Sequence, residues 1–263
     1  MEAVEPDQLV GRLRELRGSA RIAVAGGDGT MQMADAVLRG SPTVLVPIPA
    51  GHLNHFARRV GLETNQLAAA AAAAGRARDA PVGLVESGGE HVFLNTAVIG
   101  AYPAVIRLRE RMRPYMGIWP AATVAGLWVW ARWPRFDLVI RTADRELSRR
   151  TAMVWIGTGP GSFPAPHSAP LPAPGEGLEI VILPSARRRH ALRLFRSLAA
   201  RRRGQGPETV GLEVVRARSI EIDAHHHVPL TLDAEPHFLA PPVRITLEDG
   251  AIRVVSPPVA AAV

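Results

Sequence analysis

Arg21-Ile-Ala-Val-Ala-Gly-Gly-Asp-Gly-Thr30 is the stretch that decides the N-terminal fold. Residues 21–25 form a short segment that is apolar after Arg21, as in a buried strand. The segment runs directly into a glycine-rich turn. Residues 31–38 then carry apolar side chains at helical spacing, until Gly40 and Pro42 end the pattern. The sequence therefore predicts a strand, a tight turn and a helix in direct succession.

The same alternation continues on both sides of this stretch. A second strand is predicted at residues 43–48, and further helices are predicted at 7–17, 56–60 and 67–74. Strands that alternate with helices are typical of a parallel sheet covered by helices. We therefore expect a three-layer α/β domain over residues 1–80.

The pattern changes near residue 81, where short strands separated by turn signals replace the alternation. The predicted strands cover 82–86, 91–98, 136–141, 151–157, 178–183, 212–215, 219–222, 230–232, 243–247 and 251–255. Many short strands with few helices indicate a sandwich or a partly closed barrel. The sequence thus predicts a β-sandwich-like second domain over residues 81–263, with a long Pro/Gly-rich loop at 157–177.

Composition excludes several classes of chemistry. The chain has 263 residues, of which 47% are hydrophobic and 21% charged, which is typical of a globular protein. It contains no Cys, so disulfides, thiol nucleophiles and iron–sulfur clusters are excluded. All 31 basic residues are Arg, which excludes a Lys-based phosphate clamp or Schiff base. No secretory signal pattern opens the chain, and we expect a cytoplasmic protein.

The longest apolar stretch covers residues 116–131 and is shorter than the roughly 20 residues of a membrane span. Trp119, Trp128 and Trp130 lie within it, and Trp133 follows it. One interpretation is a buried helix or helical hairpin. The other is a segment that contacts a membrane peripherally, because Trp favours the bilayer interface.

The arginine-rich stretch 187–203 is open to three interpretations. Its apolar residues share one helical face, so it is predicted to be either a solvated helix packed on the sheet or a helix that approaches anionic lipid. Nucleic-acid binding is not expected, because no aromatic platform or known motif accompanies the charge. The oligomeric state cannot be predicted.

The glycine turn itself suggests phosphate binding. Glycines between a strand and a helix let the backbone wrap an anion, with the helix N-terminus facing the charge. Thr30 adds a hydroxyl, and Asp28 adds a carboxylate that could orient the site or touch a metal. The alternative is a plain tight turn in which Asp28 caps a helix.

Five blocks in order resemble the diacylglycerol kinase-type lipid kinases, including the sphingosine kinase-like members. They are Gly26-Gly-Asp-Gly-Thr30, Pro47-Ile-Pro-Ala-Gly-His-Leu-Asn-His-Phe-Ala-Arg58, Phe93-Leu-Asn-Thr-Ala-Val-Ile-Gly100, Ala173-Pro-Gly-Glu-Gly-Leu178 and Leu232-Asp-Ala-Glu-Pro236. The resemblance covers nearly the whole chain. It implies the same two-domain architecture, with the active site in the cleft between the domains.

The resemblance also implies a chemistry, namely phosphorylation of a lipid hydroxyl by ATP with Mg²⁺, at a membrane surface. Glu235, assisted by Asp233, would accept the proton of the attacking hydroxyl. Glu176 would hold a structural magnesium ion, together with backbone carbonyls including those of Ala173 and Leu178. The residues expected to line the nucleotide are Gly26, Gly27, Asp28, Gly29, Thr30, Met31, Gln32, His52 and Asn54.

The chain departs from the family pattern at several points. The usual strand–helix–strand with its Asn-Pro-x-Ser-Gly loop is not found ahead of Gly26, so we expect a partial first domain. Glu176 stands where the family has Asp, His52 where it has Thr, and Ala234 where it has Gly. The alternatives are therefore a catalytically impaired homologue that binds nucleotide or lipid, an NAD kinase, and a basic interaction module without a small ligand.

Overall fold

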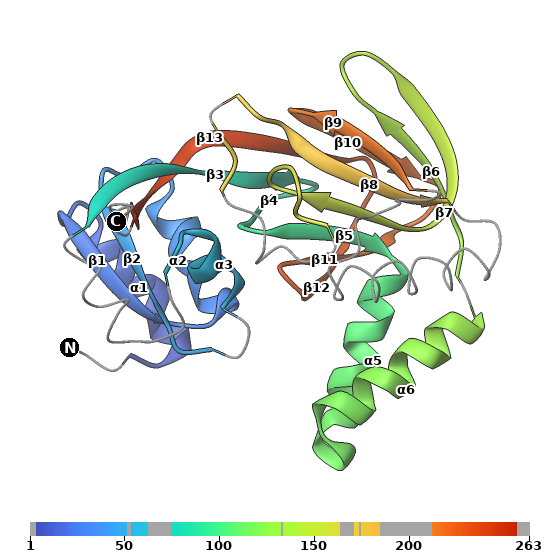
Figure 1. Cartoon of the computed structure of the whole chain (residues 1–263), viewed down its shortest axis with the longest axis horizontal. Coiled ribbons are helices and arrows are strands. Elements are labelled where there is room, and N and C mark those ends of the chain that lie inside the picture. Colours follow the sequence, from blue (N-terminus) through green and yellow to red (C-terminus); the bar gives the residue numbers. More distant parts are fainter. Residues whose placement is uncertain are drawn as a thin grey trace, which may run out of the picture.

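The computed structural model describes residues 4–51, 54–62, 75–132, 134–163, 171–173, 175–184 and 212–256. The helices predicted at 67–74 and within 187–203 lie outside these residues, as do residues 164–170 and 174 of the Pro/Gly-rich loop. Figure 1 shows the described part as an α/β region, a large curled sheet and a protruding pair of helices.

The N-terminal region follows the predicted alternation. Its elements are α1 (Pro6–Leu16), β1 (Arg21–Gly26), α2 (Asp28–Leu38), β2 (Val44–Pro49) and α3 (His55–Arg59). β1 and β2 pair in parallel, with Gly26 opposite Pro49, so the loops that follow both strands leave the sheet at one edge. β2 is buried along most of its length, as expected for a strand covered on both faces.

The remaining strands curl around a second core. They are β3 (Arg76–Glu86), β4 (Glu90–Phe93), β5 (Thr96–Gly100), β6 (Phe136–Arg141), β7 (Glu146–Gly157), β8 (Leu178–Pro184), β9 (Glu213–Ala217), β10 (Ser219–Ala224), β11 (Val228–Leu232), β12 (Glu235–Leu239) and β13 (Val243–Ser256). All described strands, β1 and β2 included, belong to one 13-stranded sheet. The prediction of mixed α/β structure is thus confirmed, and the described strands form one large curled sheet.

β3 and β13 run through both regions. They pair antiparallel, from Arg76 opposite Ser256 to Glu86 opposite Arg244, and β13 also pairs in parallel with β2. Each strand contributes side chains to the N-terminal core and to the core of the curled sheet. The predicted domain boundary near residue 80 falls inside β3, and the end of β13 packs in the N-terminal core, because these two strands join the cores.

Two helices, α5 (Ala101–Met116) and α6 (Ile118–Arg132), pack on each other and project from the sheet (Figure 1). The sequence predicted the second helix and missed the first. α6 is buried only at Ala121, Ala125 and Val129. No described helix is both long and apolar enough to cross a membrane.

Candidate functional site

Two glycine loops touch where β1 and β2 end. A Cβ added at Gly51 would lie 2.4 Å from the Cα of Gly27, and one added at Gly27 would lie 3.3 Å from the Cα of Gly51. This approach excludes a side chain at Gly51 and crowds one at Gly27. The first two motif blocks, separate in the sequence, therefore form one surface at the carboxyl edge of the parallel strands.

The N-terminus of α2 opens onto this surface. Gly27 is the N-cap, and no side chain caps the helix. Helix geometry leaves the first N–H groups without an intrahelical acceptor, which is the arrangement that binds phosphate. Gly26 and Thr30 pack together, since a Cβ at Gly26 would lie 2.4 Å from the Cβ of Thr30.

Two of the residues expected to line the nucleotide make other contacts. The side chain of Met31 is 2% exposed and lies in the N-terminal core. The Gln32 side chain donates a 2.6 Å hydrogen bond to the carbonyl of Val92 on β4. Any contact of Met31 with a nucleotide would have to involve its backbone. His52 lies outside the described residues.

Asp28 and Asn54 organise the second loop. The Asn54 side chain accepts the Gly51 N–H at 2.9 Å and donates to the Gly51 carbonyl at 2.8 Å. The Asp28 carboxylate accepts the N–H of Phe56 at 3.0 Å. Asp28 therefore fixes the start of α3 and does not cap α2. The alternative prediction that Asp28 caps the helix after the turn is wrong, and its carboxylate instead joins the first two motif blocks.

The tight turn between β11 and β12 brings a carboxylate to this surface. Asp233 and Ala234 have positive φ of 47° and 73°, as in a two-residue hairpin turn. Glu235 follows, and its Oε1 lies 2.7 Å from the position that a Cβ on Gly29 would take. The predicted base and the predicted phosphate loop, far apart in the sequence, are thus neighbours.

Asp233 holds the turn in place. Its carboxylate accepts backbone N–H groups from Leu94, Asn95 and Thr96 at 2.6, 2.8 and 2.9 Å. Burial raises the pKa of Asp233 to about 6, against the opposing effect of these three donors, and the nearby Asp28 adds to the rise. Because its oxygens are engaged by the backbone, Asp233 is a positioning residue for Glu235.

Arg59 is a part of this arrangement that the sequence analysis missed. It is 3% exposed, and its guanidinium donates to the Leu94 carbonyl at 2.9 Å and to the Thr158 hydroxyl at 2.8 Å. Burial lowers the pKa of Arg59 to about 10. The contacts of Arg59 and Asp233 with residues 94–96 divide the predicted strand 91–98 into β4 and β5.

Asp35 on α2 is a second buried acid that sequence reasoning missed. Among the described residues, neither of its carboxyl oxygens has a hydrogen-bond partner. Burial raises its pKa well above the usual range, and the charge of Asp233 acts in the same direction. Burial of this carboxyl group therefore favours its neutral form. An Asp within a helix is usually exposed to solvent, and nothing in the sequence of α2 distinguishes Asp35 from such a residue. Its burial could therefore not be predicted.

A pocket of about 310 Å³ opens beside Glu235. Its lining combines polar groups, Gln32, His237 and Glu235 among them, with the apolar side chains Met33 and Val92. The rings of His91 and His237 meet edge to face with centroids 5.1 Å apart. The pocket has the size and mixed character of a site for part of a small ligand.

The residues expected to hold a structural magnesium form a closed turn. The Glu176 carboxylate accepts the Ala173 N–H at 2.9 Å, and the Ala173 carbonyl accepts the Glu176 N–H at 3.1 Å. Leu178 begins β8 and is buried. Within the described ranges, no three His, Cys, Asp or Glu side chains lie close enough together to hold a metal. The expected site relies on one carboxylate and on backbone carbonyls, so it stays a prediction.

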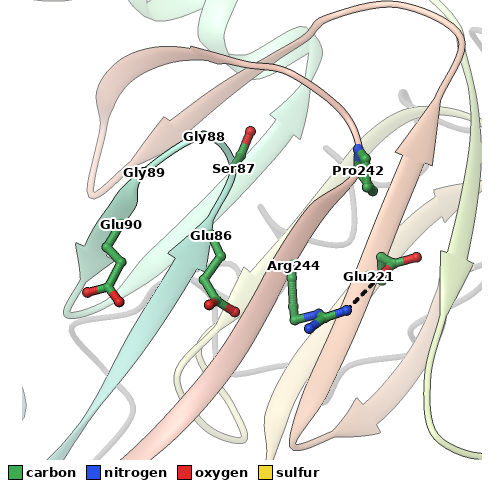
Figure 2. A pocket seen from close by; sticks show the side chains of 8 residues that line it. All are labelled: Glu86, Ser87, Gly88, Gly89, Glu90, Glu221, Pro242 and Arg244. Carbon is green, nitrogen blue, oxygen red and sulfur yellow. Dashed lines mark hydrogen bonds and ion pairs between the residues drawn. The ribbon is translucent and has the colours of Figure 1, made fainter.

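A second hollow, of about 410 Å³, lies on the curled sheet and holds none of the predicted site residues (Figure 2). Glu86, Arg244 and Glu221 are neighbours on three adjacent strands there, and Arg244 bonds Glu221 at 3.2 Å. Alternating charges across strands stabilise a sheet surface. We interpret this hollow as a surface feature beside a row of alternating charges that stabilises the sheet, and not as a ligand site.

The N-terminal part of the chain matches a known family model. Residues 3–85 match the family model of the diacylglycerol kinase catalytic domain. This range of the chain contains both glycine loops and Asp28. The match confirms the resemblance carried by the sequence motifs.

Solved structures of proteins from Bacillus anthracis str. Sterne share the fold of almost the whole chain. One, provisionally named a diacylglycerol kinase, has a TM-score of 0.76 at 20% identity over 98% of this chain and 86% of its own. Another, named a diacylglycerol kinase, has a TM-score of 0.70 at 19% identity over 98% of this chain and 84% of its own. A third, again named provisionally, has a TM-score of 0.73 at 18% identity over 98% and 85% of the two chains. These TM-scores establish a common fold.

Proposed function

We propose that this chain, whose residues 3–85 match the family model of the diacylglycerol kinase catalytic domain, transfers the γ-phosphate of ATP to a lipid hydroxyl such as that of diacylglycerol. The observation that carries the proposal is the position of Glu235 beside Gly29. A carboxylate next to a phosphate-binding helix N-terminus can accept a proton from an alcohol as the alcohol attacks a phosphoryl group.

The nucleotide would be held where the two cores adjoin. The glycine loops supply a surface without side chains, and the N-terminus of α2 supplies N–H groups for the phosphates. A Cβ at Gly51 would lie 2.4 Å from the Cα of Gly27 and would push the loops apart, which supports a function for this close approach. Asn54 belongs to the second loop and would contact the nucleotide from that side. The same contact is expected of His52 from the family resemblance alone.

Magnesium would arrive with the nucleotide. Mg²⁺ prefers oxygen ligands and needs only one or two protein carboxylates when phosphates supply the others. The carboxylate of Asp28, which lies within the glycine turn, would supply such a ligand through the oxygen that does not accept the Phe56 N–H. When bound, the ion would neutralise charge on the transferring phosphoryl group.

The acceptor hydroxyl would reach Glu235 from the pocket of about 310 Å³. Glu235 would take the proton at its carboxylate, while Asp233 keeps the turn fixed on residues 94–96. A rigid base position matters because a displacement of about 1 Å can cost a hundredfold in rate.

The test is transfer of radiolabelled phosphate from Mg-ATP to a panel of lipid alcohols in mixed micelles, with NAD as a further acceptor. The wild-type chain is compared with Glu235→Gln and with Glu146→Gln, an exposed carboxylate on β7 that pairs with Arg141 away from the site. We expect transfer to a lipid that Glu235→Gln lowers by about 10²–10⁴-fold and Glu146→Gln leaves unchanged.

Two other outcomes would contradict the proposal. Phosphorylation of NAD without phosphorylation of any lipid would make the chain an NAD kinase. A thermal shift with Mg-ATP and no transfer to any acceptor would make it a catalytically impaired homologue.

A further inference from the structure

The α5–α6 hairpin carries an exposed apolar face. Seven of the nine large apolar side chains that are exposed in the described part of the chain lie on this hairpin. They are Tyr115, Met116, Trp119, Val124, Leu127, Trp128 and Trp130. Trp119 is 79% exposed and Leu127 is 61% exposed. A soluble surface rarely concentrates apolar side chains in this way without a partner.

In α6 the small side chains are buried and the large apolar side chains are exposed, which is the reverse of a helix packed on a hydrophobic core. Its buried positions are Ala121, Ala125 and Val129, which recur every four residues and form one face. These small side chains allow α5 to pack closely, whereas Trp119, Leu127 and other large side chains point outward. The exposed face therefore follows from the helix pairing and does not result from a missing contact within the hairpin.

The same hairpin is basic. Residues 101–132 hold five Arg and one Glu. Arg109 and Arg113 both lie close to Glu110, and the Arg132 guanidinium stacks 3.8 Å from the centre of the Trp128 ring. Trp and Tyr beside Arg are typical of the headgroup region of a bilayer, where rings bury their apolar part and guanidinium groups meet anionic headgroups.

Charge distinguishes among the occupants of this face. A second copy of the hairpin would bring two basic surfaces together, which opposes association. A bilayer that contains anionic lipid offers both the apolar layer and the negative surface. The observed chemistry therefore fits an anionic membrane better than self-association.

The base of the hairpin is fixed on the strand that begins with Glu235. α5 packs on β5, β11 and β12. The Arg107 guanidinium lies 4.8 Å from the centre of the Phe238 ring on β12, three residues after Glu235. A surface bound by the hairpin would thus be held at a fixed place relative to the candidate base.

We propose that the α5–α6 hairpin is a membrane-binding element that inserts its exposed face into the interfacial layer of an anionic bilayer. This inference deepens the proposed function, because it names the surface from which a lipid acceptor is taken. The binding test itself needs no phosphoryl transfer.

The experiment measures binding to vesicles of phosphatidylcholine alone and of phosphatidylcholine mixed with phosphatidylglycerol. Cosedimentation gives the partition coefficient, and tryptophan emission reports whether the indole rings leave water. Trp119→Glu/Leu127→Glu places charges on the exposed face at positions that make no core contact. Val214→Glu is the matched control, because Val214 is 45% exposed on β9, outside the hairpin.

We expect wild type and Val214→Glu to bind the anionic vesicles with a shift of emission to shorter wavelength, and to bind neutral vesicles more weakly. We expect the double variant to bind at least about tenfold more weakly, because two large apolar side chains no longer enter the bilayer. Circular dichroism and thermal unfolding check that both variants are folded.

Three results would overturn the inference. One is the absence of wild-type binding to anionic vesicles, and another is equal binding by the double variant. The third is a dimer, detected by light scattering without lipid, that the double variant abolishes while vesicles bind neither form, since a second copy would then cover the face.

Transfer to a water-soluble short-chain diacylglycerol separates this inference from the proposed function. If the proposed function is right, the double variant retains this transfer while losing vesicle binding. If wild type binds vesicles but phosphorylates no acceptor, the proposed function fails and the membrane-binding element stands.

Discussion

Arg59 and Asp233 hold opposite polar groups of the same short segment. The Arg59 guanidinium donates to the carbonyl of Leu94, and the Asp233 carboxylate accepts the N–H of Leu94 and of the following residues. Arg59 comes from α3, beside the glycine loops, and Asp233 from the turn that carries Glu235. The segment therefore connects the two halves of the candidate site through charge-assisted hydrogen bonds.

Replacement of Arg59 should destabilise the chain far more than replacement of its neighbour. Arg59→Met leaves the Leu94 carbonyl and the buried Asp233 without this cation, and we expect a loss of about 3 kcal/mol or more in the free energy of unfolding. Arg58 is exposed on α3, so Arg58→Met should change it by less than about 0.5 kcal/mol. Urea unfolding of both variants measures the difference, and equal losses would contradict the role of Arg59.

Gly29→Ala should displace Glu235 without unfolding the chain. The added Cβ would lie 2.7 Å from Glu235 Oε1, which is the flexible end of a side chain and can move away. We expect phosphate transfer to fall about tenfold to a hundredfold, because the base leaves its position. Gly11→Ala in α1 has no atom within 4 Å of the new Cβ and serves as the control. Transfer by Gly29→Ala at the wild-type rate would exclude Glu235 as the base.

Stability should depend on pH through Asp233. Burial raises the pKa of its carboxyl to about 6 in the folded chain, above roughly 3.9 in the unfolded chain. The folded state thus binds this proton more tightly. The contribution of Asp233 to stability is complete below about pH 4 and is lost as the pH rises through about 6, by up to about 3 kcal/mol.

Asp233→Asn removes this titration. We expect the difference in unfolding free energy between the variant and wild type to move in favour of the variant as the pH rises from about 4 to above 6. Urea unfolding across this range measures it. Movement in favour of wild type would mean that the three N–H donors outweigh burial and hold the carboxylate ionised.

Ala234→Gly should stabilise the turn before Glu235. Ala234 has a φ of 73°, where a Cβ is unfavourable and glycine is not. We expect a gain of about 0.5–1 kcal/mol in the free energy of unfolding, reduced by the greater freedom of glycine in the unfolded chain. Thermal unfolding measures this gain, and a loss of stability would show that the Ala234 methyl group makes favourable contacts.

The sequence predicted the elements that depend on local pattern. The strand–turn–helix around Gly26-Gly-Asp-Gly-Thr30 was predicted correctly, because apolar period and glycine placement are local features. The proximity of Glu235 to Gly29 came only through the family resemblance. No spacing in the sequence encodes a contact between residues so far apart.

The errors also have physical reasons. Arg58 and Arg59 are indistinguishable in sequence, yet only Arg59 is buried. The strands predicted at 243–247 and 251–255 are one strand, β13, because Glu248-Asp-Gly250 forms a shift of register against β3 and not a hairpin turn. α5 was missed because Pro103 and Pro114 interrupt the helical pattern, although both lie within the helix.

The passage of β3 and β13 through both cores affects how the chain can move. A single-strand linker would let one half swing on the other, as in enzymes that close by rotation about a hinge. Here such a rotation would have to bend two paired strands together and break hydrogen bonds between them. The spacing between the glycine loops and Glu235 is therefore set when the chain folds, and we expect the two halves to melt in one cooperative transition.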